Sequence, residues 1–322
     1  MSEINLFRIE AGKATELPGK ASDLEKPLQS LIEQNLEALL GVRFLTSEHF
    51  TGKTHAGRID TLGIDEDNCP VILEYKRSKG ENVINQGLFY LDWLMDHKAE
   101  FELRVLKRYG TKVADGIDWG GPRLICIASD FTKYDGHAVQ QMSHSIELIR
   151  YKQFGPELLL LEQVNAVVSQ TPGSKAGGNS KGGSPSKVVP VIDATPATSM
   201  VAKQGAGDKT VSQWFLLMSS DMRALFESLE GYVSSLGDDV NRKDLKLYVA
   251  FKRLRNFVCV GFKKDALFLW LKLDPATIVM EPGFSRDVRL VGHWGTGDVE
   301  VLIKNHTDLD KAKGLIQKAY EG

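Results

Sequence analysis

Three residues at the end of an apolar run could carry out metal-dependent chemistry. Glu74 and Lys76 follow the apolar residues 71–73, and Asp60 lies fourteen positions before Glu74. Side chains two positions apart in a β-strand point to the same face, so we expect Glu74 and Lys76 on one side and Tyr75 on the other. A hairpin would bring both carboxylates to one Mg²⁺ ion, which prefers oxygen ligands. Two acids and a lysine at one sheet end predict phosphodiester cleavage, in which the lysine orients or activates the attacking water.

Asp60, Glu74 and Lys76 also have a purely structural interpretation, as a ladder of surface salt bridges. Acidic side chains at the ends of otherwise apolar strands are costly unless they are paired or bind a metal ion. This cost favours a functional site. His49 and His55 precede the Asp60 strand, but no other His or Cys gives the spacing of a zinc site.

The composition is that of an ordinary globular protein of about two domains. The formal net charge of −2 excludes a polycation, so any nucleic-acid contact must come from local basic patches. Cys69, Cys126 and Cys259 form no CxxC pair, which indicates a reducing compartment and argues against a disulfide framework. The sequence shows no secretory leader and no apolar run of membrane-spanning length, so we expect a cytoplasmic protein that does not enter a membrane.

Residues 169–210 are rich in Gly, Ser, Pro, Lys, Ala and Thr. Such a segment buries too little apolar surface to offset the entropy of ordering it, so we predict a flexible linker. The linker divides the chain into a first domain at 1–168 and a second domain at 211–322.

The first domain is expected to be an α/β domain with a mixed sheet flanked by helices. Ser22 and Glu25 have the spacing of a capping box, and leucines and isoleucines follow at helical spacing up to Gly41. The other predicted elements are helices at 82–107 and 134–145, and strands at 42–47, 58–64, 71–76, 124–128, 146–151 and 158–164.

The second domain is expected to be a smaller α+β domain on an antiparallel sheet. Its sequence alternates short apolar runs with turn residues, after two amphipathic segments. The predicted elements are helices at 211–218, 220–236 and 308–320, and strands at 246–251, 257–262, 267–273, 288–290 and 298–303.

The order helix, three strands, helix, strand, together with Asp60 and the Glu74-x-Lys76 strand, resembles the PD-(D/E)XK nuclease superfamily. Residues 57–63 (GRIDTLG) and 71–77 (VILEYKR) are more closely similar to the catalytic segment of NucS-type (EndoMS-type) endonucleases. The resemblance covers roughly residues 20–165. It implies a Mg²⁺- or Mn²⁺-dependent endonuclease in which Asp60 and Glu74 are metal ligands.

The same resemblance makes the carbonyl of Tyr75 a further metal ligand and Lys76 the catalytic lysine. The family also places a glutamate on the first helix. Glu25 matches that position best, because residues 28–35 follow it as the family's helix pattern requires. Glu33 is the alternative, and Glu25 has the competing interpretation that it only closes the capping box.

Gln86 and Tyr90 are four positions apart and share one face of the predicted helix. They resemble the Q-x-x-x-Y motif of RecB-like members of the superfamily, which helps to position DNA and the active site. Packing of Tyr90 in the core is the alternative. Arg58 and Arg77 are placed to meet phosphates at the rim of the site, unless they belong to a solvated basic edge.

Basic residues gather within 242–264, with aromatic residues between them. A period of two in the predicted strands would put the aromatic side chains inward and the basic ones outward, on a face that binds a phosphate backbone. Lys252, Arg253 and Arg255 are the predicted DNA contacts, and a solvated sheet face is the alternative. The closing segment 293–320 distantly resembles small YjbR-type domains, which are proposed DNA-binding modules.

Together these features predict a metal-dependent DNA endonuclease that acts in repair or defence, with a second domain that helps to choose the substrate. Single-stranded, branched and mismatched duplex DNA are the candidate substrates, and a homodimer is left open. One alternative is a nucleic-acid-binding or regulatory protein that keeps the nuclease fold without turnover. Another is an interaction protein whose linker tethers two modules to a larger assembly.

Overall fold

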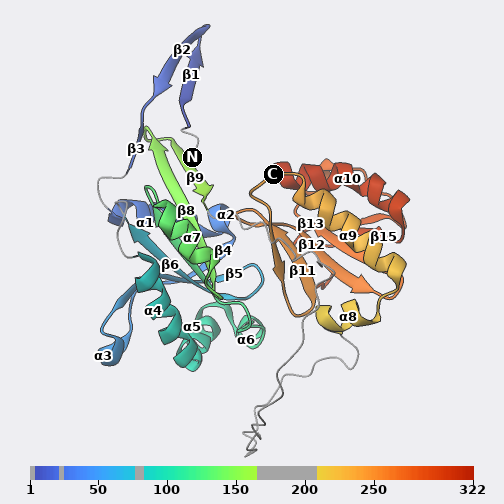
Figure 1. Cartoon of the computed structure of the whole chain (residues 1–322), viewed down its shortest axis with the longest axis horizontal. Coiled ribbons are helices and arrows are strands. Elements are labelled where there is room, and N and C mark those ends of the chain that lie inside the picture. The colour runs from blue at the N-terminus through green and yellow to red at the C-terminus, as the bar shows by residue number, and fades with distance from the viewer. Residues whose placement is uncertain (1–3, 22–24, 77–82, 165–208) are drawn as a thin grey trace, which may run out of the picture. The chain divides into compact units, whose positions relative to one another are not determined.

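A computed structural model describes residues 4–21, 25–76, 83–164 and 209–322. Ser22 and nearly all of the predicted linker lie outside these residues, so the capping box and the linker stay predictions. The residues before the linker (the first half) and those after it (the second half) belong to one compact unit. Each half is built on a main sheet of its own (Figure 1). No helix in the described ranges is long and apolar enough to cross a membrane.

The first half begins with three short strands that the sequence analysis missed. β1 (Leu6–Glu10) and β2 (Lys13–Leu17) form a two-stranded antiparallel sheet, which turns at Ala11 and Gly12 with positive φ angles of 47° and 79°. β3 (Gly19–Lys20) joins the main sheet beside β8. Most side chains of these strands are exposed, so no buried face gives them a recognisable hydrophobic period.

Seven strands form the main sheet of the first half, in the order β3, β8, β7, β6, β5, β4, with β9 paired to β8. β6, β7 and β8 are parallel and the other pairs are antiparallel, so the sheet is mixed. β6 and β7 are buried almost throughout, as their nearly continuous apolar sequences require. The bounds are β4 (Val42–Phe50), β5 (Arg58–Asp65), β6 (Pro70–Lys76), β7 (Arg123–Ala128), β8 (Ser145–Phe154) and β9 (Leu158–Gln163).

Helices cover both faces of this sheet (Figure 1). α1 (Glu25–Gln34) and α2 (Leu36–Leu40) share a buried cluster with Leu73 and Tyr75 of β6. α4 (Val83–Asp96) and α5 (Lys98–Tyr109) share the cluster on the other face with Ile72. The shorter helices are α3 (Gly52–His55), α6 (Thr111–Asp115) and α7 (Lys133–Gln140).

The helix predicted at 82–107 is two helices that meet at His97. Nδ1 of His97 lies 2.8 Å from the carbonyl oxygen of Trp93, and the two rings stack with their centroids 4.8 Å apart. The side chain of His97 thus bonds to the backbone of the turn before it, and the helix ends there. The apolar period continues across the break through Phe101 and Val105, which explains why the sequence suggested one long helix.

The second half opens with two helices that begin at side-chain caps. The hydroxyl of Thr210 accepts a hydrogen bond from the backbone of Gln213 before α8 (Val211–Leu217). The hydroxyl of Ser219 does the same for Met222 before α9 (Ser220–Ser234). These helices and α10 (His306–Glu321) are close to the predicted ones.

A six-stranded antiparallel sheet forms the core of the second half, in the order β10, β11, β12, β13, β15, β14. α9 and α10 pack on one face, with Phe226, Leu229 and Ile316 fully or almost fully buried. β10 was not predicted, and the strand expected at 288–290 is β14, three positions earlier. The bounds are β10 (Asn241–Asp244), β11 (Tyr248–Lys252), β12 (Asn256–Lys263), β13 (Ala266–Leu271), β14 (Ser285–Asp287) and β15 (Val299–Ile303).

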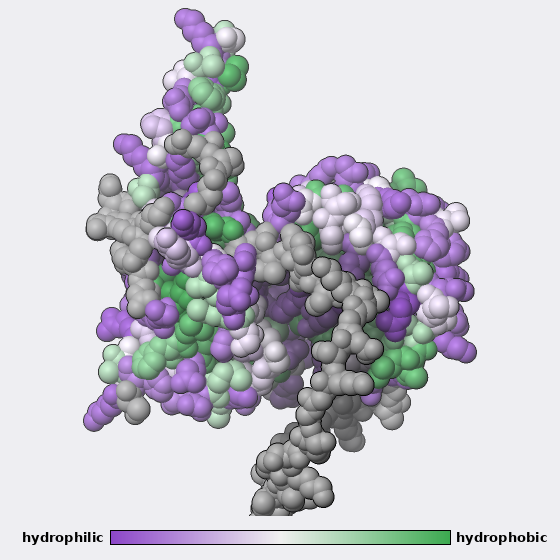
Figure 2. All heavy atoms as spheres, in the orientation of Figure 1, coloured by the Kyte–Doolittle hydropathy of each residue, from purple (hydrophilic) through white to green (hydrophobic). Residues whose placement is uncertain are grey.

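The predicted fold class is therefore confirmed: a mixed α/β half and a smaller α+β half with an antiparallel sheet. Hydrophilic side chains cover most of the described surface in the view of Figure 2, and hydrophobic ones gather there in small groups. This distribution agrees with a chain in which 25% of the residues are charged.

Gly63 in β5 is the tightest point beside the predicted site. A Cβ there would lie 2.4 Å from the side chain of Val42 and 2.9 Å from the backbone oxygen of Arg43. The backbone of a paired strand cannot give way without moving the strand, so we expect Gly63→Ala to lower the free energy of unfolding by about 1–3 kcal/mol.

Gly231→Ala in α9 is the matched control, because nothing lies within 4 Å of its Cβ. Alanine is favoured over glycine inside a helix by about 1 kcal/mol, so this variant should be as stable as the wild type or more stable. Chemical denaturation of the three proteins measures the difference. A Gly63→Ala protein of wild-type stability would contradict the close approach of β4 and β5.

Candidate active site

The β5–β6 hairpin brings Asp60 and Glu74 together, as the sequence predicted. The strands pair antiparallel with Thr61 opposite Leu73, which puts Asp60 beside Glu74. Oε1 of Glu74 accepts a hydrogen bond from the backbone N–H of Asp60 at 3.2 Å. Oδ2 of Asp60 accepts one from the backbone N–H of Tyr75 at 3.0 Å. Each carboxylate is thus held by the backbone of the other's strand.

Glu74 is fully buried, and its second oxygen, Oε2, has no hydrogen-bond partner. Burial and the charge of Asp60 raise the pKa of Glu74 to about 9, against the opposing effects of the Asp60 N–H and the Lys76 ammonium. A buried acceptor without a partner costs free energy. This oxygen is therefore the atom of the site that most needs a cation or a proton.

Asp60 is only partly buried, but its surroundings raise its pKa as they raise that of Glu74. Burial raises the pKa of this carboxyl above its ordinary value, and the charges of Glu48 and Glu25 add to that effect. The N–H of Tyr75 and the charge of Lys76 oppose it. Two adjacent carboxyl groups with raised pKa values do not easily carry two negative charges unless a cation joins them.

The donor set fits a hard divalent cation. Oε2 of Glu74 is an open oxygen position beside Asp60, and carboxylate oxygens are the ligands that Mg²⁺ and Mn²⁺ accept. No group of three His, Cys, Asp or Glu side chains with metal-ligand geometry occurs in the described part of the chain. A metal ion here would thus rely on two carboxylates, the backbone and water, which is usual for Mg²⁺. The role of the Tyr75 carbonyl stays a prediction.

Tyr75 points away from the carboxylates, as the strand period requires. Its phenol is 1% exposed in the core between β6 and α1, and its oxygen lies 3.4 Å from the hydroxyl of Thr61. Lys76 is partly exposed at the end of β6, and its charge acts on both Asp60 and Glu74. Glu74 and Lys76 therefore share one face of the sheet and Tyr75 the other.

The first helix offers two carboxylates with different surroundings. Oε1 of Glu33 accepts hydrogen bonds from Thr61 at 2.6 Å and from Gln29 at 3.0 Å, on the Tyr75 side of the sheet. Glu25, at the start of α1, is near enough to Asp60 for its charge to raise the pKa of that carboxyl. Of the two candidates, Glu25 is the one whose charge acts on the pKa of Asp60.

Gln29 is a site residue that the sequence analysis did not select. Its side-chain N–H donates to the backbone oxygen of Asp60 at 2.8 Å and to the hydroxyl of Ser47 at 3.1 Å. The side chain is 4% exposed although it is polar. A glutamine at an apolar position of an amphipathic helix was the available signal, since a buried amide is expected to hold a specific partner.

Gln86 and Tyr90 form the pair that the sequence suggested, and Tyr90 braces the start of β5. Gln86 donates to the Tyr90 hydroxyl at 3.2 Å, and the same hydroxyl accepts from the backbone N–H of Arg58 at 3.0 Å. A Cβ at Gly57 would lie 2.5 Å from the Tyr90 ring, so only glycine allows this approach. Tyr90 is buried and thus acts on the strand that carries Asp60.

Arg58 presents its side chain at the surface two positions from Asp60. The side chain is 65% exposed, and its nearest acid is Glu48 at 3.6 Å. A contact this exposed is worth little, so the guanidinium can turn to a phosphate. Arg77 lies outside the described residues, and its predicted contact with phosphate stays a prediction.

Four of the eight basic residues in the stretch 242–264 are paired with acids within the described part of the fold, which corrects the prediction of a free basic face. Arg242 is paired with Glu230 and Asp244, at 2.7 Å each. Lys243 reaches two aspartates of the first half. The strands do not alternate as predicted. β11 is buried along its whole length, and Tyr248 and Phe251 belong to buried clusters on opposite faces of the sheet.

Lys252 is the clearest correction. Its side chain is buried, and its ammonium donates to both oxygens of Glu147 at 2.9 and 3.1 Å, so it is not placed to meet DNA. Nε of Arg253 lies 2.5 Å from the Asp239 carboxylate, although 43% of its side chain is exposed. Arg255 is exposed in the turn between β11 and β12. Of the three predicted contacts in this half, Arg255 is the most accessible.

Comparisons with known proteins find similarity in both halves. Residues 212–322 match a family described as "Domain of unknown function (DUF5655)". A protein of Haemophilus influenzae described as "Uncharacterized protein" is 28% identical over 318 residues, which are 98% of this chain and 99% of that protein. That relative is thus similar along its whole length.

Solved structures match only a part of the chain. The crystal structure of a repair endonuclease from Pyrococcus abyssi is 21% identical with a TM-score of 0.27, and the match covers 40% of this chain and 50% of that one. A structure of EndoMS in complex with double-stranded DNA is 23% identical with a TM-score of 0.23, and the match covers 42% and 47%. The chain spans about half the length of each of these proteins.

The charge state of Glu74 can be tested by replacing it with glutamine. The pKa of Glu74 is higher in the folded than in the unfolded protein, so the group contributes stability that is fully present below about pH 4.5 and is lost as the pH rises to about 9. Glu74→Gln lacks this dependence. We therefore expect the melting temperature of Glu74→Gln, relative to the wild type, to increase from pH 5 to pH 9.

Thermal unfolding in EDTA at several pH values measures this difference. Glu37→Gln, which changes an exposed carboxylate of α2, is the control and should follow the wild-type profile. Parallel profiles of Glu74→Gln and wild type would show that Glu74 is ionised in the folded protein without metal.

Proposed function

We propose that this protein is a DNA endonuclease that depends on Mg²⁺ or Mn²⁺. The observation that carries the proposal is the meeting of Asp60 and Glu74 across the β5–β6 hairpin, with the buried Oε2 of Glu74 left without a partner. The resemblance of the strands around Asp60 and Glu74 to the catalytic segment of NucS-type endonucleases supports it.

Asp60 and Glu74 would hold the metal ion, and the Tyr75 carbonyl is the third proposed ligand. The bound metal ion would supply Lewis-acid activation of the scissile phosphate and lower the pKa of a water molecule. Lys76 shares the Glu74 face of β6, so its ammonium would orient the water and stabilise the charge that develops on the phosphate. Glu25 would help to hold the ion or its water from the helix.

Other residues of the chain keep this geometry. Gln29 fixes the backbone oxygen of Asp60, and the Tyr90 hydroxyl fixes the backbone N–H of Arg58. Both bonds act on β5 within two positions of the catalytic aspartate. Such support is needed, because displacing a reacting group by about 1 Å can cost about 100-fold in rate.

Asp60→Asn, Glu74→Gln and Lys76→Met should each abolish cleavage while the protein stays folded. Groups that act as a unit contribute non-additively, so we expect each single variant to lose several orders of magnitude and the double variants to lose little more. Cleavage of plasmid, single-stranded and mismatched DNA in Mn²⁺, with EDTA as the blank, measures the effect.

Glu37→Gln is the control for these variants, since it changes an exposed carboxylate of α2. Comparing Glu25→Gln with Glu33→Gln then identifies the helix carboxylate, and only the first should slow cleavage. Two catalytic variants with nearly wild-type, metal-dependent cleavage would refute the site. DNA binding without any cleavage by the wild type would favour a non-catalytic nucleic-acid-binding protein.

Arg58→Ala should weaken DNA binding without changing cleavage at saturating DNA. The exposed guanidinium lies two positions from Asp60, where a phosphate next to the scissile one would pass. Loss of one contact to duplex DNA should reduce the slope of log affinity against log salt by about 0.9. The measurement is a salt titration in Ca²⁺, with Lys318→Ala, an exposed lysine of α10, as the control. Identical slopes would remove Arg58 from the DNA contacts.

A further inference from the structure

The turn of the candidate catalytic hairpin is acidic and internally ordered. Oδ1 of Asp65 accepts hydrogen bonds from the backbone N–H groups of Asp67 and Cys69, at 2.9 and 2.8 Å. Asn68 completes the reversal with a φ of 61°, in the left-handed region that asparagine tolerates. The side chain of Asp65 is therefore part of the turn that joins the Asp60 strand to the Glu74 strand.

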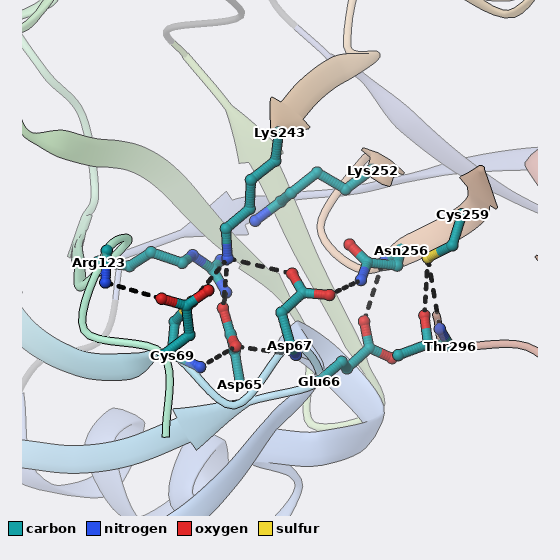
Figure 3. Close-up of polar contacts among 12 residues, drawn as sticks. Asp65, Glu66, Asp67, Cys69, Arg123, Lys243, Lys252, Asn256, Cys259 and Thr296 are labelled. Carbon is teal, nitrogen blue, oxygen red and sulfur yellow. Dashed lines mark hydrogen bonds and ion pairs between the residues drawn. The ribbon is translucent and has the colours of Figure 1, made fainter. Parts of the chain in front are cut away.

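Residues of the second half of the chain form hydrogen bonds to the acidic side chains of this turn (Figure 3). The Lys243 ammonium donates to Oδ2 of Asp65 at 3.0 Å and to Oδ2 of Asp67 at 3.1 Å. The hydroxyl of Tyr248 and the side-chain amide of Asn256 both donate to Oδ1 of Asp67 at 2.7 Å. Both oxygens of Asp67 are thus bound by residues of β10, β11 and β12.

The next residue of the turn is held through the backbone. Oε2 of Glu66 accepts a hydrogen bond from the backbone N–H of Asn256 at 2.9 Å. Asn256 therefore bonds to two consecutive turn residues, one through its main chain and one through its side chain. All three acids of the turn have a partner in the second half.

A buried arginine continues the network beneath the turn. Arg123 donates to Asp65 at 2.9 Å and to Glu147 at 2.8 Å, and Glu147 also binds the Lys252 ammonium. Three acids, Asp65, Asp67 and Glu147, thus face three bases, Arg123, Lys243 and Lys252. Glu66, the remaining acid of the turn, lies 3.9 Å from Lys272.

The cluster is buried, so its charges depend on one another. Burial alone would raise the pKa of Asp65, but the charges of Lys243 and Arg123 outweigh it and hold the pKa below its ordinary value. Apolar contacts close the cluster, because Cys69 packs with Tyr248 and Trp270 in one buried group. Removing one partner from a buried ion pair leaves an uncompensated charge, which is strongly destabilising.

We propose that the second half of the chain is a permanent clamp on the turn of the catalytic hairpin, with Lys243, Tyr248 and Asn256 as positioning residues for Asp60 and Glu74. A separate second domain, joined to the first only by the predicted flexible linker, would leave these acids without their partners. The part of the proposal that concerns the metal ion rests on the proposed function. The part that concerns the association of the two halves does not.

The clamp acts on the site through the hairpin register. Asp60 lies beside Glu74 only in the present pairing, and a slip of one residue would turn Asp60 to the opposite face of the sheet. The register of a hairpin is set by its turn. Fixing Asp65 and Asp67 therefore fixes how the two carboxylates meet.

The first test uses the complete chain with a specific protease site inserted between Gly182 and Gly183. After folding and cutting, the two pieces of the wild type should stay together in size-exclusion chromatography at 0.5 M salt. Lys243→Met should let them separate. Arg242→Met is the matched control, since Arg242 directly precedes Lys243 in β10 and pairs with Glu230 and Asp244 instead.

Separation of the cut wild type, or no effect of Lys243→Met, would overturn the clamp. If Lys243→Met does not fold, Tyr248→Phe, which removes only a hydroxyl group, replaces it as the test variant. It should speed hydrogen exchange at the backbone amides of Asp67 and Cys69, and unchanged exchange there would also count against the proposal.

The second test measures Mn²⁺ binding by the uncut chain with calorimetry. Residues that support metal ligands typically change affinity by about 10- to 100-fold, so we expect Tyr248→Phe to weaken binding by about tenfold while Arg242→Met does not. Equal Mn²⁺ affinity of Tyr248→Phe and wild type would overturn the positioning role. If the wild type binds no Mn²⁺, the proposed function is refuted. The experiment with the cut chain then still tests whether the second half is a permanent clamp, because it does not depend on metal binding.

Discussion

The burial of one carboxyl group beside another is the constraint on which the first half depends. Glu74 lies in a strand that is buried except at its last residue, and Asp60 is held against it by backbone hydrogen bonds in both directions. The same burial that makes β6 a stable central strand makes the charge of Glu74 costly. The buried strand therefore needs a cation or a proton beside Glu74, and the charge of Lys76 meets this need only in part.

Contacts between residues close in the sequence could be predicted, whereas contacts between residues far apart in the sequence could not. Asp60, Glu74 and Lys76 lie within two neighbouring strands, so the period of two and the length of the turn were enough to bring them together. The partner of Lys252 is 105 positions away, and no local pattern identifies it. The same reason hid Gln29, whose bond to Asp60 spans 31 positions. Exposed strands such as β1 and β2 were missed because they bury no face.

The basic stretch of the second half shows how composition can mislead. Lysines and arginines alternating with aromatic residues describe a phosphate-binding face and an internal docking face equally well. What distinguishes the two is the position of the acids, and here Asp65, Asp67 and Glu147 are in the other half. The acidic turn and the basic strands are complementary parts of one surface, and each looked like a separate feature when it was considered alone.

This pairing has a consequence for the order in which the protein folds. Tyr248 and Asp67 are 181 positions apart, so a chain made at about 5–20 residues per second completes the acidic turn roughly 10–40 s before its last partners leave the ribosome. During that time Asp67 has none of its folded-state partners, because Lys243, Tyr248 and Asn256 do not yet exist. Long-range pairing of this kind also slows folding after release. Synthesis of the last third of the chain thus controls when the β5–β6 hairpin acquires its final, buried state.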